Sequence, residues 1–169
     1  MLGVAEENGE IELDSVKSEI VRAGLDYWRR LKGARSFPTR RQMSPRQMGD
    51  LLRNVVLLKV IEGGEDYEFS IFGAAHIQAC TFNMQGSLMR DVQRVWPSMG
   101  DAMRSVYGRV LQSRQPLALR TIRNDCPGIN PVVSEHVVLP MGKKESCVDH
   151  ILVFSVYEPV AQPRELAAS

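Results

Sequence analysis

Apolar residues recur at spacings of three and four from Leu13 to Leu31, a pattern that predicts an amphipathic helix. Asp14 or Ser15 could cap its start, and Gly33 is a typical stop, so we expect the helix within residues 13–34. Residues 1–12 are acidic and unpatterned, and we expect them to be frayed or disordered. The apolar stripe either packs on its own domain or forms a dimer or partner contact through Leu13, Val16, Ile20, Tyr27, Trp28 and Leu31.

The next stretch changes from irregular to strand-like patterning. Residues 35–41 form a Pro-containing connector, and Ser44-Pro45 opens a short helix with Pro at its first position, running to about Leu52. Residues 54–61 are rich in Val and Leu, and residues 67–72 alternate in polarity. The Gly63-Gly64 turn lies between them, so the two runs predict a β-hairpin.

The second half of the chain predicts a helical middle followed by three strands. Residues 74–95 break into short helical pieces, and a longer helix follows over residues 98–113, with Ser98 and Asp101 at its start. Strands are expected over residues 117–123, 132–139 and 148–157. The pattern therefore predicts one α+β domain over residues 35–158 and a short tail over residues 159–169.

Composition and charge narrow the class of protein. The net charge is only +1, and the nine Lys and Arg between residues 22 and 53 lack interleaved aromatic residues, so we expect a solvated face and no nucleic-acid binding. The first residues lack the positive and apolar regions of a signal peptide, so we expect none, and no apolar run reaches membrane-spanning length. Three widely spaced cysteines fit a cytoplasmic protein with free thiols.

The sequence contains no catalytic motif of the common kinds, such as a Walker loop, a GxSxG elbow or an HExxH pair, so we expect no enzyme. His136 and His150 fall on consecutive predicted strands and could be cross-strand neighbours; no metal site is expected there. A small cone-shaped α+β enzyme is a weaker alternative, with Glu135 or His150 as the group at the bottom of its cavity.

Six local motifs, in chain order, resemble the stand-alone bacterial PAS-like domain family found mostly in alphaproteobacteria. The resemblance covers roughly residues 25–157 and implies a five-stranded antiparallel sheet in which two strands, short helices with one longer helix, and three strands follow one another. The residues that carry the motifs most clearly are Trp28, Arg35, Pro38, Arg40, Gly73, Gly86, Glu135 and Pro140. The chain departs from the family at Ser70, where Arg is usual, and at Ala74, so a pairing of that Arg with Glu135 is expected to be absent.

The resemblance implies a sensory or regulatory module that encloses a small pocket between sheet and helices. Occupancy of the pocket would change how the flanking helix packs, with output through protein–protein contact or a homodimer. Haem and flavin are disfavoured as cofactors, because the long helix has no His for haem and because Ala79 precedes Cys80 where the flavin-adduct motif needs Asn. His76, in the first short helix, is expected to be a satisfied or exposed side chain.

Methionine is frequent in the helical middle, where it either fills the core or forms an adaptable apolar pocket wall. We expect a small apolar ligand there; a pure interaction domain without a pocket is the alternative. Because strands alternate, a one-residue slip would exchange the two faces of the sheet. With that alternative open, the pocket candidates are Phe69, Ile71, Cys80, Phe82, Met103, Tyr107, Val137, Leu139, Leu152 and Phe154.

Overall fold

The computed structural model describes residues 9–123 and 132–160 and contains a mixed α+β fold around one antiparallel sheet. The strand order is β1-β4-β5-β6-β2-β3, with every neighbouring pair antiparallel. The strands are β1 Gly9–Ile11, β2 Val55–Ile61, β3 Asp66–Phe72, β4 Leu117–Arg123, β5 Val132–Met141 and β6 His150–Pro159. The five predicted strands are present, and every end lies within two residues of its expected position.

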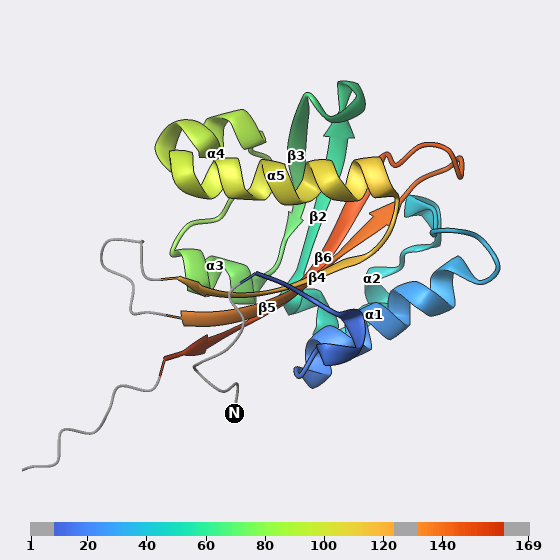
Figure 1. Ribbon diagram of the computed structural model, residues 1–169, viewed down its shortest axis with the longest axis horizontal. Helices are drawn as coiled ribbons and strands as arrows, with labels where there is room; N and C mark the ends of the chain where they lie inside the picture. Colours follow the sequence, from blue (N-terminus) through green and yellow to red (C-terminus); the bar gives the residue numbers. More distant parts are fainter. Residues whose placement is uncertain (1–8, 124–131, 161–169) are drawn as a thin grey trace, which may run out of the picture.

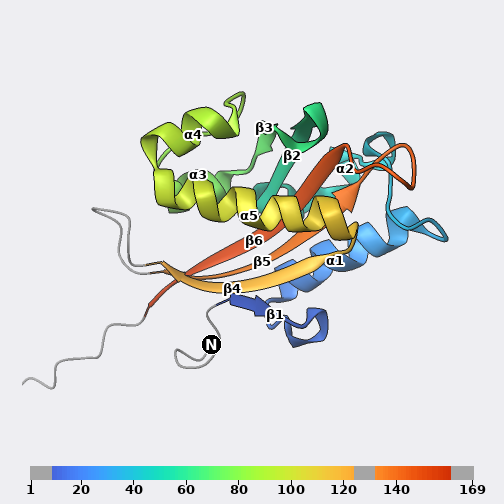
Figure 2. The same ribbon diagram turned by 45° about the horizontal axis from the view of Figure 1, so that its top comes forward.

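Helices cover both faces of the sheet (Figures 1 and 2). On one face lie α3, α4 and α5; on the other lies α1, in contact with β5 and β6. The helices are α1 Glu19–Lys32, α2 Pro45–Met48, α3 Ala74–Cys80, α4 Met89–Val95 and α5 Pro97–Ser113, with 3-10 turns at Leu13–Ser15, Arg40–Gln42, Gly49–Asn54 and Glu62–Gly64.

The N-terminal region is more ordered than its sequence predicts. Residues 9–11, expected to be frayed, form β1 and pair with β4 from Ala118 to Arg120. The first helix begins at Glu19 and not at Leu13, because Ser18 caps it through a hydrogen bond from the Val21 amide to its hydroxyl. Residues 1–8, 124–131 and 161–169, which include most of the predicted tail, lie outside the described residues.

Helix α1 packs closely against its own sheet. A side chain at Gly24 would come within 2.3 Å of the Phe154 ring, so the absence of a Cβ sets the distance between helix and sheet. Tyr27 packs edge-on against the same ring, and the Trp28 indole N–H donates to the Pro140 carbonyl oxygen at 2.8 Å. Val16, Tyr27 and Trp28 are therefore core residues, and the expectation that they face a dimer or partner is wrong.

Only part of the predicted contact stripe is accessible. Ile20 is 40% exposed, while Leu13 and Leu31 lie at the border of the core.

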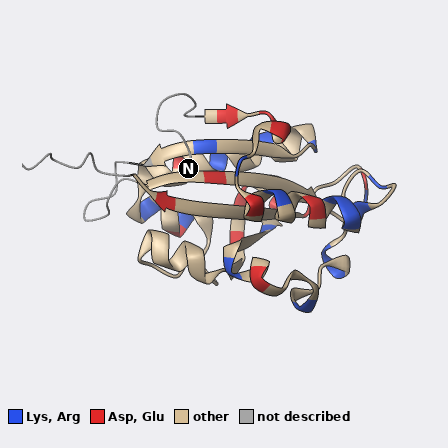
Figure 3. Cartoon of the chain, turned by 90° about the horizontal axis from the view of Figure 1, so that it is seen from below, with Lys and Arg blue, Asp and Glu red and all other residues tan. Residues whose placement is uncertain are grey.

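Among the described residues no helix is long and apolar enough to cross a membrane. Acidic and basic residues are interspersed over the elements seen in Figure 3, and Arg35 of the basic stretch is held by the carbonyls of Phe37, Gly142 and Lys143.

Candidate functional site

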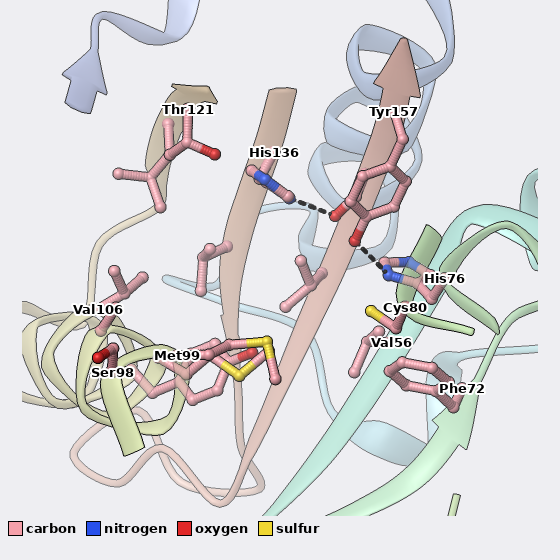
Figure 4. Close-up of a pocket in the computed structure, with 17 residues that line it drawn as sticks. Val56, Phe72, His76, Cys80, Ser98, Met99, Val106, Thr121, His136 and Tyr157 are labelled. Carbon is pink, nitrogen blue, oxygen red and sulfur yellow. Dashed lines mark hydrogen bonds between the residues drawn. The ribbon is translucent and has the colours of Figure 1, made fainter. Parts of the chain in front are cut away.

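A cavity of about 220 Å³ lies between α5, α3 and the sheet (Figure 4). It is open on one side, where Ser98 and Ala102 of α5 are exposed. Most of its wall is apolar. The lining residues are Val56, Phe72, His76, Cys80, Ser98, Met99, Ala102, Met103, Val106, Tyr107, Leu119, Thr121, His136, Val138, Val153, Ser155 and Tyr157.

The apolar wall follows from helix and strand periodicity. On α5, Met99, Met103 and Val106 are spaced by four and three residues, so they share the face turned to the sheet. On the sheet, Val138 and Val153 are direct cross-strand partners on adjacent strands and form part of the floor. The two surfaces meet without filling the space between them.

A buried hydrogen-bonded pair forms one polar part of the wall. His76, at the start of α3, places Nε2 at 3.0 Å from the Asn54 carbonyl oxygen and Nδ1 at 2.9 Å from the Tyr157 hydroxyl (Figure 4). A carbonyl oxygen can only accept, so Nε2 carries the proton and Nδ1 accepts from Tyr157. Burial lowers the pKa of His76 to about 4, and the ring is neutral near pH 7.

A second polar group comes from neighbouring strands. His136 on β5 lies opposite Ser155 on β6, with Nδ1 at 2.6 Å from the serine hydroxyl. Its Nε2 lies at 2.8 Å from the Ser134 hydroxyl, which in turn contacts the Thr121 hydroxyl at 2.7 Å. These side chains all project to the cavity face, and they bond mainly to one another.

Three of the sequence-derived pocket candidates line this cavity: Cys80, Met103 and Tyr107. The four candidates on β5 and β6 lie on the opposite face, toward α1, so their expected orientation is wrong by one residue. Both faces of these strands are apolar because helices cover both, and the alternation alone could not distinguish them. The four residues are Val137, Leu139, Leu152 and Phe154.

The remaining candidates are placed elsewhere. Phe69 is fully buried and packs against Phe72, next to the cavity wall but not in it. Ile71 pairs with Leu57 on β2 and is partly buried beside the core. Phe82 is 46% exposed and stacks edge-on against Trp96. Most of the lining residues were not among the candidates. On β5 and β6 the missed residues are those at every second position, and this alternation was the available signal: His136, Val138, Val153, Ser155 and Tyr157.

Glu135 is fully buried on the α1 face and does not reach the cavity. Its carboxylate accepts from the Arg120 guanidinium at 2.7 Å and from the amides of Lys17 and Ser18 at 3.0 and 2.7 Å. Arg120 also donates to the Ser15 carbonyl oxygen. The pairing with an arginine at position 70 is absent, as Ser70 requires, and Arg120 on β4 is the arginine that pairs with Glu135 in this chain.

The histidine expectations are corrected in one respect. His150 pairs with Met141 across the sheet and bonds to Asp149 at 2.7 Å, while His136 pairs with Ser155, so the two histidines are not neighbours. Neither His150 nor Glu135 lines the cavity, which removes both suspects for a cone-type catalytic group. Within residues 9–123 and 132–160, no group of three or more His, Cys, Asp or Glu could hold a metal ion.

A second hollow, of about 650 Å³, lies beside α3 and the end of β6. It is wider and more open than the cavity, and Arg53, Gln78 and Glu158 line it together with Ile20. Such an open surface does not enclose a small molecule, so the cavity under α5 is the better candidate site.

Comparison with known proteins gives a match to one protein family. Neither the curated proteins nor the solved structures contain a match to this chain. The model of the family described as PAS domain matches residues 16–152, which include α1, all the helices of the cavity face and most of the sheet. The chain therefore belongs to the PAS domain family.

Proposed function

We propose that this PAS domain is a non-catalytic sensory module that binds a small, mainly apolar molecule and reports its presence through protein–protein contact. PAS domains are sensory or regulatory modules in general, and the family match covers most of this chain. The observation that carries the proposal is the cavity between α5 and the sheet.

The size of the cavity suits a small ligand. A dry protein cavity of about 150 Å³ holds benzene, so by proportion this one has room for roughly nine non-hydrogen atoms. A porphyrin or an isoalloxazine ring system is larger than the 220 Å³ space, which supports a proposal without haem or flavin. Burial of apolar ligand surface against Met103, Val106 and Val138 would supply the binding free energy.

The two faces of β4 suggest how occupancy would be relayed. Leu119 and Thr121 line the cavity, whereas Arg120 between them holds Glu135 and the Ser15 carbonyl oxygen on the other face. A ligand that shifts β4 would therefore also shift the segment that leads into α1. This geometry supports a change in the packing of the N-terminal helix as the output.

The residues that carry the family motifs hold separate parts of the fold together. Trp28 bonds to the Pro140 carbonyl, and Arg35 bonds to the carbonyl oxygens of Gly142 and Lys143. Gly73 packs against the backbone at Arg53, where a Cβ would meet the carbonyl oxygen at 2.3 Å. We propose a bacterial setting because these motifs resemble a bacterial family, and a cytoplasmic location because the three cysteines are widely spaced and Cys147 is a free thiol.

Native mass spectrometry of the purified protein tests the ligand directly. We expect a bound small molecule in the wild type and its loss in Val138→Phe, which fills the floor of the cavity. Val95→Phe is the matched control, because Val95 is 63% exposed and lies outside the cavity. A wild type that is empty and that no small-molecule fragment stabilises against heat would contradict the proposal.

A pure interaction domain is the second candidate, favoured by one surface feature. Phe82 and Val95 are 46% and 63% exposed, and Phe82 stacks on Trp96 beside Val95. If this cluster joins two copies, light scattering should give a dimer that Phe82→Ser converts to a monomer. A wild type that is monomeric at every concentration would exclude self-association.

A further inference from the structure

Tyr107 brings an unusual hydroxyl to the cavity. It lies in the middle of α5, its ring packs edge-on against Tyr67 at 5.4 Å, and it is only 5% exposed. Among the described residues, the one fully buried side-chain oxygen or nitrogen atom without a hydrogen-bond partner is Asp66 Oδ2, so the Tyr107 hydroxyl is not sealed in the core. No described residue forms a hydrogen bond with this hydroxyl, and because Tyr107 lines the cavity, the hydroxyl can donate to a molecule bound there.

The other buried polar side chains of the wall have partners of their own. His76 uses both ring nitrogens, for Asn54 and Tyr157, and His136 uses both for Ser155 and Ser134. These groups can tolerate an apolar neighbour without losing a hydrogen bond. Tyr107 is thus the residue with which a polar atom of the ligand can form a hydrogen bond without breaking one inside the protein.

Tyr107 is fixed as a hydrogen-bond donor at physiological pH. Burial, with smaller contributions from Tyr67 and Cys80, raises the pKa of its hydroxyl well above the ordinary value, so the proton stays in place. Cys80 is itself a lining residue, so the electrostatic interaction between the two groups fits a hydroxyl that borders the cavity.

The wall carries no fixed charge. None of its described residues is Lys, Arg, Asp or Glu. An ionised ligand would lose its hydration without gaining an opposite charge, which is unfavourable. An uncharged ligand avoids this cost.

We propose that the cavity selects a small uncharged molecule bearing a hydroxyl or carbonyl group, whose oxygen accepts a hydrogen bond from the Tyr107 hydroxyl. This rests on the proposed function, since it names the chemical class of ligand for the same cavity.

A pair of matched probes separates the hydrogen bond from hydrophobic binding. Benzyl alcohol and ethylbenzene have nearly the same shape and differ by one hydroxyl. We expect Tyr107→Phe to weaken the Kd of benzyl alcohol roughly 3- to 10-fold, the worth of one neutral hydrogen bond. The Kd of ethylbenzene should stay within about twofold, since the rest of the wall is unchanged. Both are measured by titration in NMR.

Two controls accompany this comparison. Tyr27→Phe removes a hydroxyl on the α1 face, which accepts from the Ser44 amide, and should change neither Kd. Without ligand, Tyr107→Phe should be as stable to heat as the wild type or more so, because the lost hydroxyl has no protein partner. A clear fall in its melting temperature would overturn the inference.

The outcomes distinguish this inference from the proposed function. If neither neutral probe binds the wild type, the ligand-binding function itself fails. If both bind and Tyr107→Phe affects them equally, the cavity stands and the role of Tyr107 is overturned. Benzoate is the third probe, and tighter binding of benzoate than of benzyl alcohol would overturn the preference for an uncharged ligand.

Discussion

Three consecutive residues of β5 place their side chains alternately on the two faces of the sheet. Ser134 and His136 belong to the hydrogen-bonded groups at the cavity, whereas Glu135 points to α1 and holds Arg120. Each is buried or partly buried, so each needs a partner to offset its lost hydration. Single substitutions at these positions should therefore have effects that depend on which partner is left behind.

Glu135→Gln tests the buried ion pair. The amide keeps one oxygen for the Lys17 and Ser18 amides but leaves the buried Arg120 charge without a counterion. We expect the free energy of unfolding to fall by about 3 kcal/mol or more. Denaturant unfolding measures it.

The matched control is Glu10→Gln. Glu10 pairs with Arg109, and both side chains are about half exposed, so water screens the pair. The same chemical change there should cost about 1 kcal/mol or less. Equal losses for the two variants would contradict a structural role for the Arg120–Glu135 pair.

His76 predicts a dependence of stability on pH. Its pKa is lowered from 6.5 to about 4 in the folded protein, chiefly by burial, so between these values the unfolded chain binds the proton more readily. The neutral His76 ring therefore contributes to the free energy of unfolding. This contribution is fully present above pH 6.5 and is lost as the pH falls to about 4, which lowers the free energy of unfolding by up to about 3 kcal/mol. Denaturant unfolding at pH 7 and pH 5 should show a smaller decline in His76→Gln. An NMR titration of the His76 ring with a midpoint near 6.5 would contradict the burial argument.

At this scale the sequence predicts the chemistry of residues better than their direction. Cys80, Met103 and Tyr107 lie on helices of the cavity face, where the period of the pattern places them in the wall. The strand candidates such as Val137 and Phe154 face α1. The sequence could not predict this, because both faces of β5 and β6 are apolar and the period of two does not say which face is which.

Among the elements, α1 shows how one glycine sets a packing distance. Gly24 sits in the middle of the helix, where Ala would ordinarily be better by about 1 kcal/mol. Here the Phe154 ring occupies the space that a Cβ would need. Gly24 thus lowers the intrinsic stability of the helix but allows α1 to approach β6 closely.

Gly24→Ala should lower the free energy of unfolding despite the gain in helix propensity. A Cβ at 2.3 Å from the Phe154 ring forces the helix or the ring to move, at a cost of about 1–3 kcal/mol. Gly108→Ala in α5 is the control, because nothing lies within 4 Å of its added Cβ, and it should gain up to about 1 kcal/mol. If Gly24→Ala were as stabilising as Gly108→Ala, the close packing of α1 on β6 would be contradicted.

The elements themselves are largely predictable from the sequence. Strands β2 to β6 and helix α5 are long enough for their periods to be read, and β4 has the expected bounds of Leu117–Arg123. Strand β1 is not predictable, because three residues show no alternation and its order comes from pairing with β4. The start of α1 is shifted because Ser18, and not Asp14 or Ser15, is its cap.

In the whole molecule, the sheet separates the cavity from the buried Arg120–Glu135 ion pair. The cavity lies under α5 on one face, and on the other Arg120 and Glu135 hold the segment that leads into α1. Figure 2 shows α5 and α1 on opposite faces of the sheet. The same strands border both. This arrangement lets a molecule bound on one face alter packing on the other through a shift of strands that both sites share.

The most direct test of this account is an NMR titration of protein labelled at methionine methyl groups, with benzyl alcohol as the ligand. Met99 and Met103 line the cavity, whereas Met48 and Met141 are buried outside its wall and serve as internal references. We predict that the methyl signals of Met99 and Met103 shift first and show intermolecular NOEs to the ring of the ligand. Absence of any shift at saturating ligand, or NOEs to Met48 or Met141 in their place, would contradict the account.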